Sequence, residues 1–308
     1  MSNPIVQQLN PSQRRAVQTV DGPVLIIAGP GSGKTMVITH RIAYLVDTIQ
    51  ISPFQILAVT FTNKAANEMR DRLVNLIRGK AHAVTVKTFH AFCSSVLRRY
   101  GKHIGLGSDY AIFDSEDQRD ALKMAMEDVE VDPKRYPIRG IQSAISKAKS
   151  TMLDVHIFKT QGQSFYDEIV GRVYASYERI LSANNGVDFD DLLLKTINVF
   201  NGQPSVLEQY QQKFLHVMVD EFQDTNIVQY QLAKILSGSF RNLCVVGDPD
   251  QAIYSWRNAD IRNILSFQQD FPDAAFIELE ENYRSTGNIL DVAKGLISAN
   301  KQRIEKKI

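Results

Sequence analysis

Residues 28–35 have the types and spacing that hold phosphate groups. They read Ala-Gly-Pro-Gly-Ser-Gly-Lys-Thr, a P-loop pattern with alanine in place of the usual first glycine. The glycines let backbone N–H groups wrap around phosphates, and a helix after the loop points its positive end at them. We expect Lys34 to reach the β- and γ-phosphates of a nucleotide and the Thr35 hydroxyl to ligate Mg²⁺. A glycine-rich turn without a ligand is a poor alternative, because Gly-Lys-Thr stands where a strand gives way to a helix. The expected phosphate-binding residues are Ala28, Gly29, Pro30, Gly31, Ser32, Gly33, Lys34 and Thr35.

A second candidate group is acidic. Residues 219–226 read Val-Asp-Glu-Phe-Gln-Asp-Thr-Asn directly after an apolar run. Asp220 at a strand end can supply the second protein contact to Mg²⁺, and Glu221 is placed to orient and deprotonate a water molecule. Alone, this stretch also fits a solvated acidic turn. Beside a P-loop, it favours hydrolysis of ATP.

The next apolar run, residues 243–248, is followed by a polar and aromatic stretch. Gln251 stands where a side-chain amide can sense the γ-phosphate or the attacking water. Tyr254 and Trp256, the only tryptophan of the chain, follow closely. From spacing alone these rings fit a core position and a stacking platform for nucleic-acid bases equally well.

These residues need a parallel sheet to bring them together. Short apolar runs predict buried strands at 23–28, 56–61, 84–88, 215–220, 243–248 and 275–279. Helical patterns follow the first three, over about 34–46, up to about residue 77, and after residue 88, so the chain is an α/β protein with a parallel sheet. Residues 113–187 contain no such strand, and amphipathic stretches at 115–129 and 164–182 predict a helical insertion, closed by a turn at 184–186. Another helix is expected from about Asn288.

Composition limits the class of protein. The chain has 308 residues and a formal charge of +1, so any grip on nucleic acid must come from a local groove. Cys93 and Cys244 stand beside apolar residues without metal-ligand spacing, which favours buried thiols. The first residues lack the pattern of a secretory signal, and no apolar run reaches membrane-spanning length. We expect a soluble intracellular protein, in the nucleus if eukaryotic and in the cytoplasm if bacterial.

The motifs, in this order, resemble those of the superfamily 1A DNA helicases of the UvrD/Rep/PcrA family. The resemblance covers essentially the whole chain and includes the P-loop and the acidic motif. It also includes residues 10–13 (Asn-Pro-Ser-Gln), 60–66 (Thr-Phe-Thr-Asn-Lys-Ala-Ala), 88–93 (Thr-Phe-His-Ala-Phe-Cys), 247–257 and 282–286 (Asn-Tyr-Arg-Ser-Thr). The form Gly-Asp-Pro-Asp-Gln at 247–251 is also similar to the eukaryotic anti-recombinase branch, a weakly discriminating feature.

The resemblance implies a RecA-like fold, 3′→5′ movement on single-stranded DNA or at junctions with duplex, and roles for further residues. Gln13 would read adenine, Tyr283 would stack on it, and Arg41 would lie near the nucleotide. Arg284 would contact the γ-phosphate, joining Glu221 and Gln251 as a catalytic residue. Thr88 and His90 also fit helix N-cap positions. The implied DNA-binding residues are Phe61, Asn63, Thr88, His90, Tyr254, Trp256 and Arg257.

The family also has a second RecA-like domain, which supplies another arginine to the ATP cleft. Here the sequence stops shortly after residues 282–286, so we expect a fragment or a truncated product. The predicted organisation is a RecA-like domain at 1–112 and 188–284, a helical insertion at 113–187, and the start of a second RecA-like domain at 285–308. Two other interpretations stay open: an ATP- and DNA-binding module without turnover, and the motor part of a helicase–nuclease.

Overall fold

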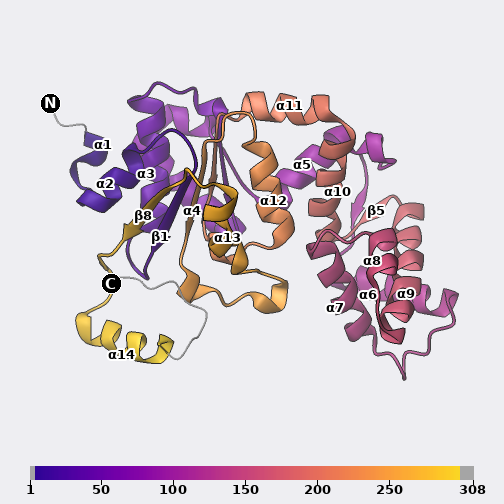
Figure 1. Cartoon of the computed structure of the whole chain (residues 1–308). Coiled ribbons are helices and arrows are strands. Elements are labelled where there is room, and N and C mark those ends of the chain that lie inside the picture. Colours follow the sequence, from indigo (N-terminus) through magenta and orange to yellow (C-terminus); the bar gives the residue numbers. More distant parts are fainter. Residues whose placement is uncertain (1–3, 299–308) are drawn as a thin grey trace. The chain divides into compact units, whose positions relative to one another are not determined.

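The computed structural model describes residues 4–298 and divides into two compact units (Figure 1). The first unit comprises Met1–Phe89, Glu208–Thr225 and Ala233–Ile308, and the second comprises His90–Leu207 and Asn226–Leu232. The chain therefore leaves the first unit and returns to it. The predicted insertion at 113–187 falls wholly within the second unit. The expected division into domains, including the segment 285–308, of which 299–308 lie outside the described residues, stays a prediction.

The first unit is built on a six-stranded sheet. Its strands are β1 (Val24–Ala28), β2 (Ile56–Thr60), β3 (Thr85–Thr88), β6 (His216–Val219), β7 (Leu243–Gly247) and β8 (Ala275–Leu279). Their order across the sheet is β3-β2-β6-β7-β1-β8, and every pairing is parallel. β1, β2, β6 and β7 are buried along their whole length, as expected for strands covered on both faces. The carboxyl ends of parallel strands share one edge, so the loops after them meet there.

Helices cover this sheet. One hydrophobic core joins its strands to α2 (Pro11–Gln18), α3 (Lys34–Asp47) and α4 (Asn63–Ile77). The remaining elements of the unit are α1 (Pro4–Gln7), α13 (Arg262–Asp270), α14 (Gly287–Ile297), and the short 3-10 turns η1 (Pro53–Gln55), η2 (Arg78–Ala83), η4 (Phe222–Asp224), η5 (Pro249–Gln251) and η6 (Ser255–Arg257).

The second unit is mainly helical. It contains η3 (Gly101–Ile104), α6 (Ser115–Asp128), α7 (Ile138–Ser150), α8 (Val155–Gln161), α9 (Phe165–Ala183), α10 (Phe189–Gly202) and all of α5 (Phe89–Tyr100) except Phe89. The helices α11 (Pro204–Lys213) and α12 (Ile227–Leu236) have residues in both units. A core of its own joins α6, α7 and α9. Two short strands, β4 (Ala111–Ile112) and β5 (Gly186–Val187), pair in parallel. β5 follows Asn185, whose positive φ of 44° marks the turn predicted at 184–186.

A buried ionic cluster holds three helices of the second unit together. The ammonium group of Lys149 on α7 lies 2.5 Å from Glu178 Oε1 on α9. It also lies 2.7 Å from Asp188 Oδ2 and 2.8 Å from Asp191 Oδ1, at the start of α10. Burial alone lowers the pKa of Lys149, but the three carboxylates raise it well above its ordinary value. Lys195 joins the cluster through Glu178.

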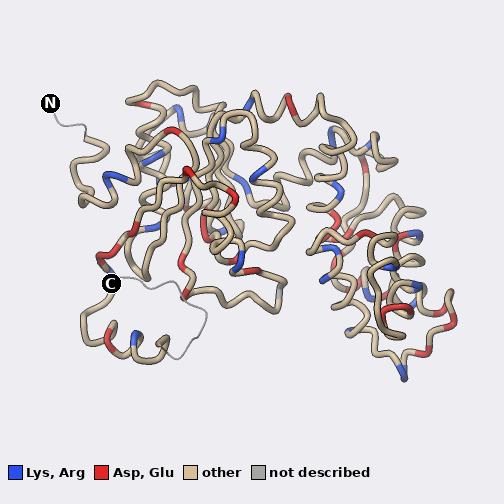
Figure 2. Tube along the Cα trace, in the orientation of Figure 1, with Lys and Arg blue, Asp and Glu red and all other residues tan. Residues whose placement is uncertain are grey.

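Most elements match the expectations from sequence. Each predicted strand of the sheet is present within one residue of its expected bounds, and the α/β fold with a parallel sheet is confirmed. Cys93 and Cys244 are buried free thiols, as predicted. Among residues 4–298, no helix is both long and apolar enough to cross a bilayer. Lys and Arg residues are interspersed with Asp and Glu residues along the trace of each unit (Figure 2).

Candidate nucleotide site and aromatic surface

The P-loop connects β1 to α3 at the carboxyl edge of the sheet. Gly31 has a φ of +68°, a conformation that side chains disfavour. A Cβ atom at this position would lie only 2.6 Å from the Cβ of Arg284. The Gly31 carbonyl accepts a hydrogen bond of 3.0 Å from the Tyr283 N–H. Glycine at 31 thus allows the segment after β8 to lie directly against the P-loop.

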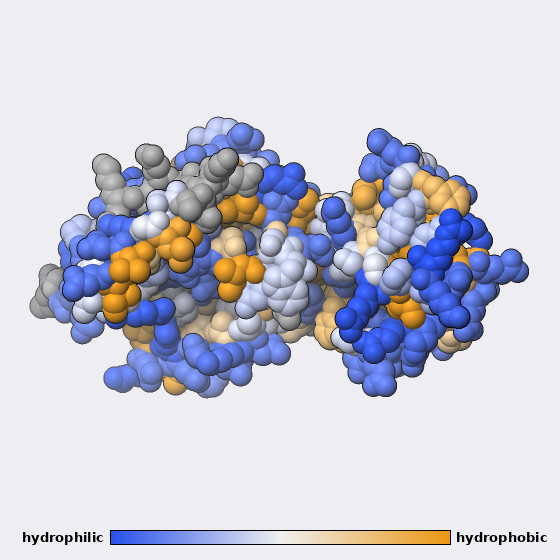
Figure 3. Space-filling view, turned by 90° about the horizontal axis from the view of Figure 1, so that it is seen from below, coloured by the Kyte–Doolittle hydropathy of each residue, from blue (hydrophilic) through white to orange (hydrophobic). Residues whose placement is uncertain are grey.

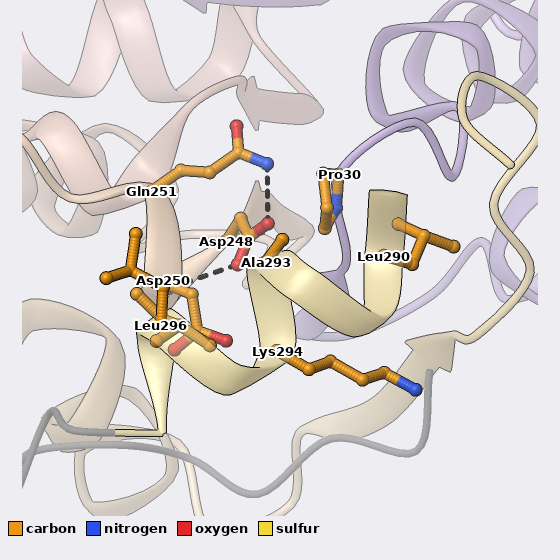
Figure 4. Close-up of a pocket in the computed structure, with 9 residues that line it drawn as sticks. Pro30, Asp248, Asp250, Gln251, Leu290, Ala293, Lys294 and Leu296 are labelled. Atoms are coloured by element: carbon orange, nitrogen blue, oxygen red, sulfur yellow. Dashed lines mark hydrogen bonds between the residues drawn. The ribbon is translucent and has the colours of Figure 1, made fainter. Parts of the chain in front are cut away.

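Lys34 is the first residue of α3, and its side chain is 9% exposed. Its ammonium group donates to Gln251 Oε1 at 3.3 Å and lies 3.9 Å from Asp248 Oδ2. The Gln251 amide in turn donates to the same Asp248 oxygen at 2.6 Å (Figure 4). The lysine and glutamine that the sequence assigned to the γ-phosphate therefore lie in contact.

Thr35 and Asp220 meet as expected of residues that share a metal ion. The Thr35 hydroxyl donates to Asp220 Oδ2 at 3.1 Å. Burial, followed by the negative charge of Glu221, raises the pKa of Asp220 to about 6. A hydroxyl beside a carboxylate is a hard oxygen donor set that suits Mg²⁺. Among the described residues no three His, Cys, Asp or Glu side chains form a metal cluster.

Glu221 follows Asp220 in an unusual backbone conformation. Its φ and ψ of 50° and 48° lie in the left-handed region, which a non-glycine residue rarely adopts. Its N–H donates to Asp220 Oδ1 at 3.0 Å, and its Oε2 accepts a hydrogen bond of 2.9 Å from the Gln223 amide. Glu221 lines the same cavity as Lys34 and Thr35.

Gln13 is held against the P-loop by its own helix. Asn10 and Gln13 form a capping box at the start of α2, in which each side chain bonds to the other's backbone N–H. The Gln13 amide also donates to the Ser32 carbonyl at 3.0 Å. Asn10 donates to the Tyr283 hydroxyl at 2.9 Å, which links α2 to the segment after β8. The Tyr283 side chain is 61% exposed.

Arg41 lies away from the cavity wall. Its guanidinium is 1% exposed and donates to the backbone carbonyls of Ala16, Thr19 and Val20, at the end of α2. It does not line the cavity beside the P-loop. Its contacts fasten α2, which carries Gln13, to α3.

A cavity of about 420 Å³ collects most of the expected nucleotide-binding residues. It is lined by Gly31, Ser32, Gly33, Lys34, Thr35, Met36, Arg72, Glu221, Gln251, Tyr283 and Arg284. Met36 and Arg72 were not predicted. Met36 directly follows the P-loop motif, and it was not predicted because the motif ends at Thr35. Arg72 is an ordinary helical position of α4, and nothing in its sequence context marks it.

A smaller and more apolar cavity of about 240 Å³ lies between α14 and the loop after β7 (Figure 4). Pro30 of the P-loop and Leu290, Ala293, Leu296 and Ile297 of α14 contribute to its wall. The α14 side chains of Ile289 and Val292 are exposed by 60% and 77%, and Leu296, at the cavity wall, is exposed by 80%. α14 faces the viewer in Figure 3, where orange apolar side chains gather.

The aromatic residues predicted to bind DNA form a group in which Trp256 is exposed and Phe61 and Tyr254 are half-buried. The Phe61 and Tyr254 rings lie 5.0 Å apart, and the Tyr254 and Trp256 rings 6.2 Å apart. Trp256 is 70% exposed. Of the two interpretations that spacing left open, core packing therefore does not apply to Trp256. Asn63 is the first residue of α4 and is exposed, close in sequence to Phe61.

The remaining predicted DNA-binding residues are distributed between the two units. Thr88 ends β3 in the first unit, directly before α5. His90 belongs to the second unit and is the second residue of α5, so its interpretation as an N-cap is wrong: the helix begins directly after the strand. Its ring lies edge-on to Phe189, with centroids 6.0 Å apart, and Phe189 is 47% exposed. Phe189 is not among the DNA-binding residues that the sequence predicts. The side chain of Arg257 lies outside the described part of the structure.

Comparison with known proteins adds a family relationship. Residues 9–272 match the family model of the UvrD/REP helicase N-terminal domain. A Bacillus subtilis (strain 168) protein named ATP-dependent DNA helicase PcrA is 47% identical over 308 residues, 100% of this chain. Proteins of the same name from Staphylococcus epidermidis (strain ATCC 12228 / FDA PCI 1200) and Staphylococcus aureus (strain NCTC 8325 / PS 47) are 47% and 46% identical over 304 residues, 99% of this chain.

The chain spans 42% of the length of each of these relatives. All three are bacterial, so they give no support to the nuclear location or to the eukaryotic branch considered from the sequence.

Proposed function

The chain belongs to the UvrD/REP helicase N-terminal domain family, and from this premise we propose that it is the ATP-hydrolysing part of a DNA helicase motor. One observation carries the proposal. Lys34 contacts Gln251, and Thr35 contacts Asp220, at the edge of the sheet where the loops after β1, β6 and β7 meet. These are the groups needed to hold a triphosphate, a divalent cation and a water molecule in line.

The residues have separate tasks in this proposal. Lys34 neutralises charge on the β- and γ-phosphates. Thr35 and Asp220 hold Mg²⁺, which stabilises negative charge on the phosphates when bound. Glu221 accepts a proton from the attacking water, and Gln251 orients that water or the γ-phosphate.

The nucleotide base and the outer phosphate would be held by the segment after β8 and by α2. Tyr283 is exposed beside Asn10, where its ring can stack on adenine. The contact of Gln13 with Ser32 holds its side chain beside the P-loop, where it can contact adenine. Arg284 lines the cavity and would contact the γ-phosphate. Arg41 supports the position of Gln13 indirectly, because it bonds to a backbone carbonyl of α2.

Single-stranded DNA is the proposed partner of the aromatic group. Phe61, Tyr254 and Trp256 offer ring faces to bases, and Asn63 lies at a helix start, whose N–H groups favour a phosphate. By the family resemblance, Thr88, His90 and Arg257 are also proposed to contact DNA. Preference for a junction with duplex and 3′→5′ direction are inferred from the family resemblance alone.

Full motor activity is proposed to need more than this chain, which spans 42% of the length of its relatives. The exposed apolar side chains of α14, among them Val292 and Leu296, fit a helix that belongs to a second domain. The resemblance implies that this domain supplies a further arginine to the cleft. Phosphoryl transfer depends on positioned positive charge, so hydrolysis without it should be slow.

The test compares the 308-residue chain with the longest natural form of the protein. We expect weak ATP binding and slow, barely DNA-stimulated hydrolysis by the chain, and DNA-stimulated hydrolysis with strand displacement by the long form. A long form that binds ATP and DNA without turnover would favour the alternative, a binding module. Robust unwinding by the chain as a monomer would refute the need for a second domain.

A further inference from the structure

The five residues Glu221–Thr225 hold both ends of the loop that carries Tyr254 and the exposed Trp256. At the start of this loop, residues 248–260, the Asp248 N–H donates to Gln223 Oε1 at 2.9 Å. At its end, the Asp260 N–H donates to the Thr225 carbonyl at 3.0 Å. The proposed general base and the aromatic loop are therefore fastened to the same short segment.

Gln223 uses both ends of its amide in this arrangement. The side chain is 2% exposed, and its Nε2 donates to Glu221 Oε2 at 2.9 Å and to Asp224 Oδ2 at 3.3 Å. Only one orientation of the amide fits, because the other would turn its donors toward the Asp248 N–H and its oxygen toward the carboxylates. One side chain thus contacts the proposed base on one side and the loop on the other.

Gly247 makes room for this amide. A Cβ atom at 247 would lie 2.9 Å from Gln223 Oε1 and 3.2 Å from the Gln223 backbone nitrogen. Any larger residue would have to displace Gln223 or the end of β7. The close approach of Gln223 to the end of β7 therefore depends on glycine at 247.

The far end of the loop is anchored separately. The Asn263 amide donates to the Thr225 carbonyl at 2.9 Å and to its hydroxyl at 3.2 Å, and both residues are buried. Between the two anchors lie Gln251, which contacts Lys34, and the Tyr254–Trp256 pair. A ligand that moves these rings would therefore displace the loop, and the first residue of this loop is hydrogen-bonded to Gln223.

We infer that Gln223 is a positioning residue that couples the carboxylate of Glu221 to the position of the aromatic loop. The inference rests on the proposed function and deepens it, since it names a route by which DNA on Trp256 can change hydrolysis. Hydrogen bonds weaken steeply with misalignment. A small shift of Asp248 therefore turns the Gln223 amide, and the Glu221 carboxylate turns with it.

The test uses two substitutions and one control. Gln223→Met keeps the approximate size and removes the side-chain contacts with Glu221, Asp224 and Asp248. Gln223→Glu keeps an acceptor for the Asp248 N–H but removes the donor to Glu221. The control is Gln229→Met: Gln229 is 3% exposed and also accepts a backbone hydrogen bond, from Asn226, outside this network.

Trp256 gives a readout that does not depend on turnover, because it is the only tryptophan of the chain. With a non-hydrolysable ATP analogue and Mg²⁺, we expect the parent chain and Gln229→Met to change their tryptophan emission. Both Gln223 variants should bind the analogue within about twofold of the parent affinity and lose most of that change. In the longest natural form, both should keep the KM for ATP while DNA stimulation of kcat falls about tenfold, or about 1.4 kcal/mol in coupling.

Three results would overturn the inference. An undiminished emission change and stimulation in Gln223→Met would mean that coupling takes another route. A parallel loss of analogue affinity, thermal stability and stimulation would reduce Gln223 to a structural residue. A parent chain that binds no nucleotide would remove the proposed function itself, a failure visible before any variant is compared.

Discussion

Replacing Lys149 with methionine should strongly destabilise the helical unit. Methionine retains most of the volume but leaves Glu178, Asp188 and Asp191 around an apolar side chain. The Lys149 side chain is 0% exposed, and those of Asp188 and Asp191 are 4% and 2% exposed. Removing one partner from a buried ionic group typically costs about 3–5 kcal/mol. Lys195 still lies 3.0 Å from Glu178 and 3.6 Å from Asp191, so we expect the lower end, about 3 kcal/mol.

This loss should depend on pH in a defined direction. Burial and then the charge of Asp188 already raise the pKa of Asp191 to about 7, and loss of Lys149 raises it further. A carboxyl whose folded pKa lies above its unfolded value contributes stability that is complete below the unfolded pKa and disappears as pH rises through the folded pKa. The variant should therefore be weakest at pH 8, and its deficit should shrink by about half at pH 5.5.

The assay is urea unfolding at both pH values, followed by hydrogen exchange of α7, α9 and α10, because the two units need not unfold together. Lys123→Met is the matched control. Lys123 lies 2.7 Å from Asp120, the same separation as Lys149 from Asp188, but both side chains are at least half exposed. Exposed pairs contribute little. A Lys149 variant that unfolds like the control, or equally early at both pH values, would refute the reasoning.

The remaining predictions concern the proposed site, in the longest natural form of the protein. Lys34→Ala should abolish ATP hydrolysis with unchanged circular dichroism, and parental turnover would disprove the P-loop assignment. Glu221→Gln should trap bound ATP, whereas Asp220→Asn should raise the Mg²⁺ needed for activity; identical metal titrations would contradict this division of roles. Trp256→Ala should weaken single-stranded DNA binding about tenfold, and the loss should persist at high salt, where phosphate contacts fade; a salt titration identical to the parent's would exclude stacking. Phe189→Ala should lower the same affinity by a smaller factor, and unchanged binding would make its exposed ring incidental.

The parts predictable from sequence are those in which neighbouring residues act together. Lys34 and Thr35 could be predicted because they directly follow the glycines of the P-loop, where the helix begins. Asp220 could be predicted because it stands at the end of an apolar run. Burial on both faces makes such strands apolar throughout, so their ends are easy to locate. The order of strands in the sheet then brings Thr35 to Asp220. The sequence predicted that both residues hold Mg²⁺ but not that their side chains contact each other.

The parts that were missed depend on distant segments. Gln223 lies in a motif whose acidic residues are expected to bind metal and water, but its partner Asp248 comes from another strand end. Lys149 and Asp188 are separated by 39 residues and meet only because three helices pack around them. Charged residues in amphipathic helices are usually exposed, so periodicity alone gave no reason to expect a buried cluster.

Arg41 illustrates a different limit. The family resemblance implied a place near the nucleotide, but its side chain bonds to carbonyls at the end of α2. A guanidinium can satisfy free carbonyls as readily as phosphates, since both are oxygen acceptors. Sequence identifies the donor, and the helix packing determines which acceptor it meets.

The left-handed backbone of Glu221 has a consequence for anyone who engineers this chain. A non-glycine residue in that conformation lowers the free energy of unfolding by on the order of 1 kcal/mol relative to glycine. At position 221, thermal stability and the proposed chemistry therefore favour different residues. Selection for stability alone would favour glycine at 221 and would remove the proposed base with no damage to the sheet. The same position would then yield a robust protein that still offers its phosphate loop and its aromatic surface but has no residue to activate water.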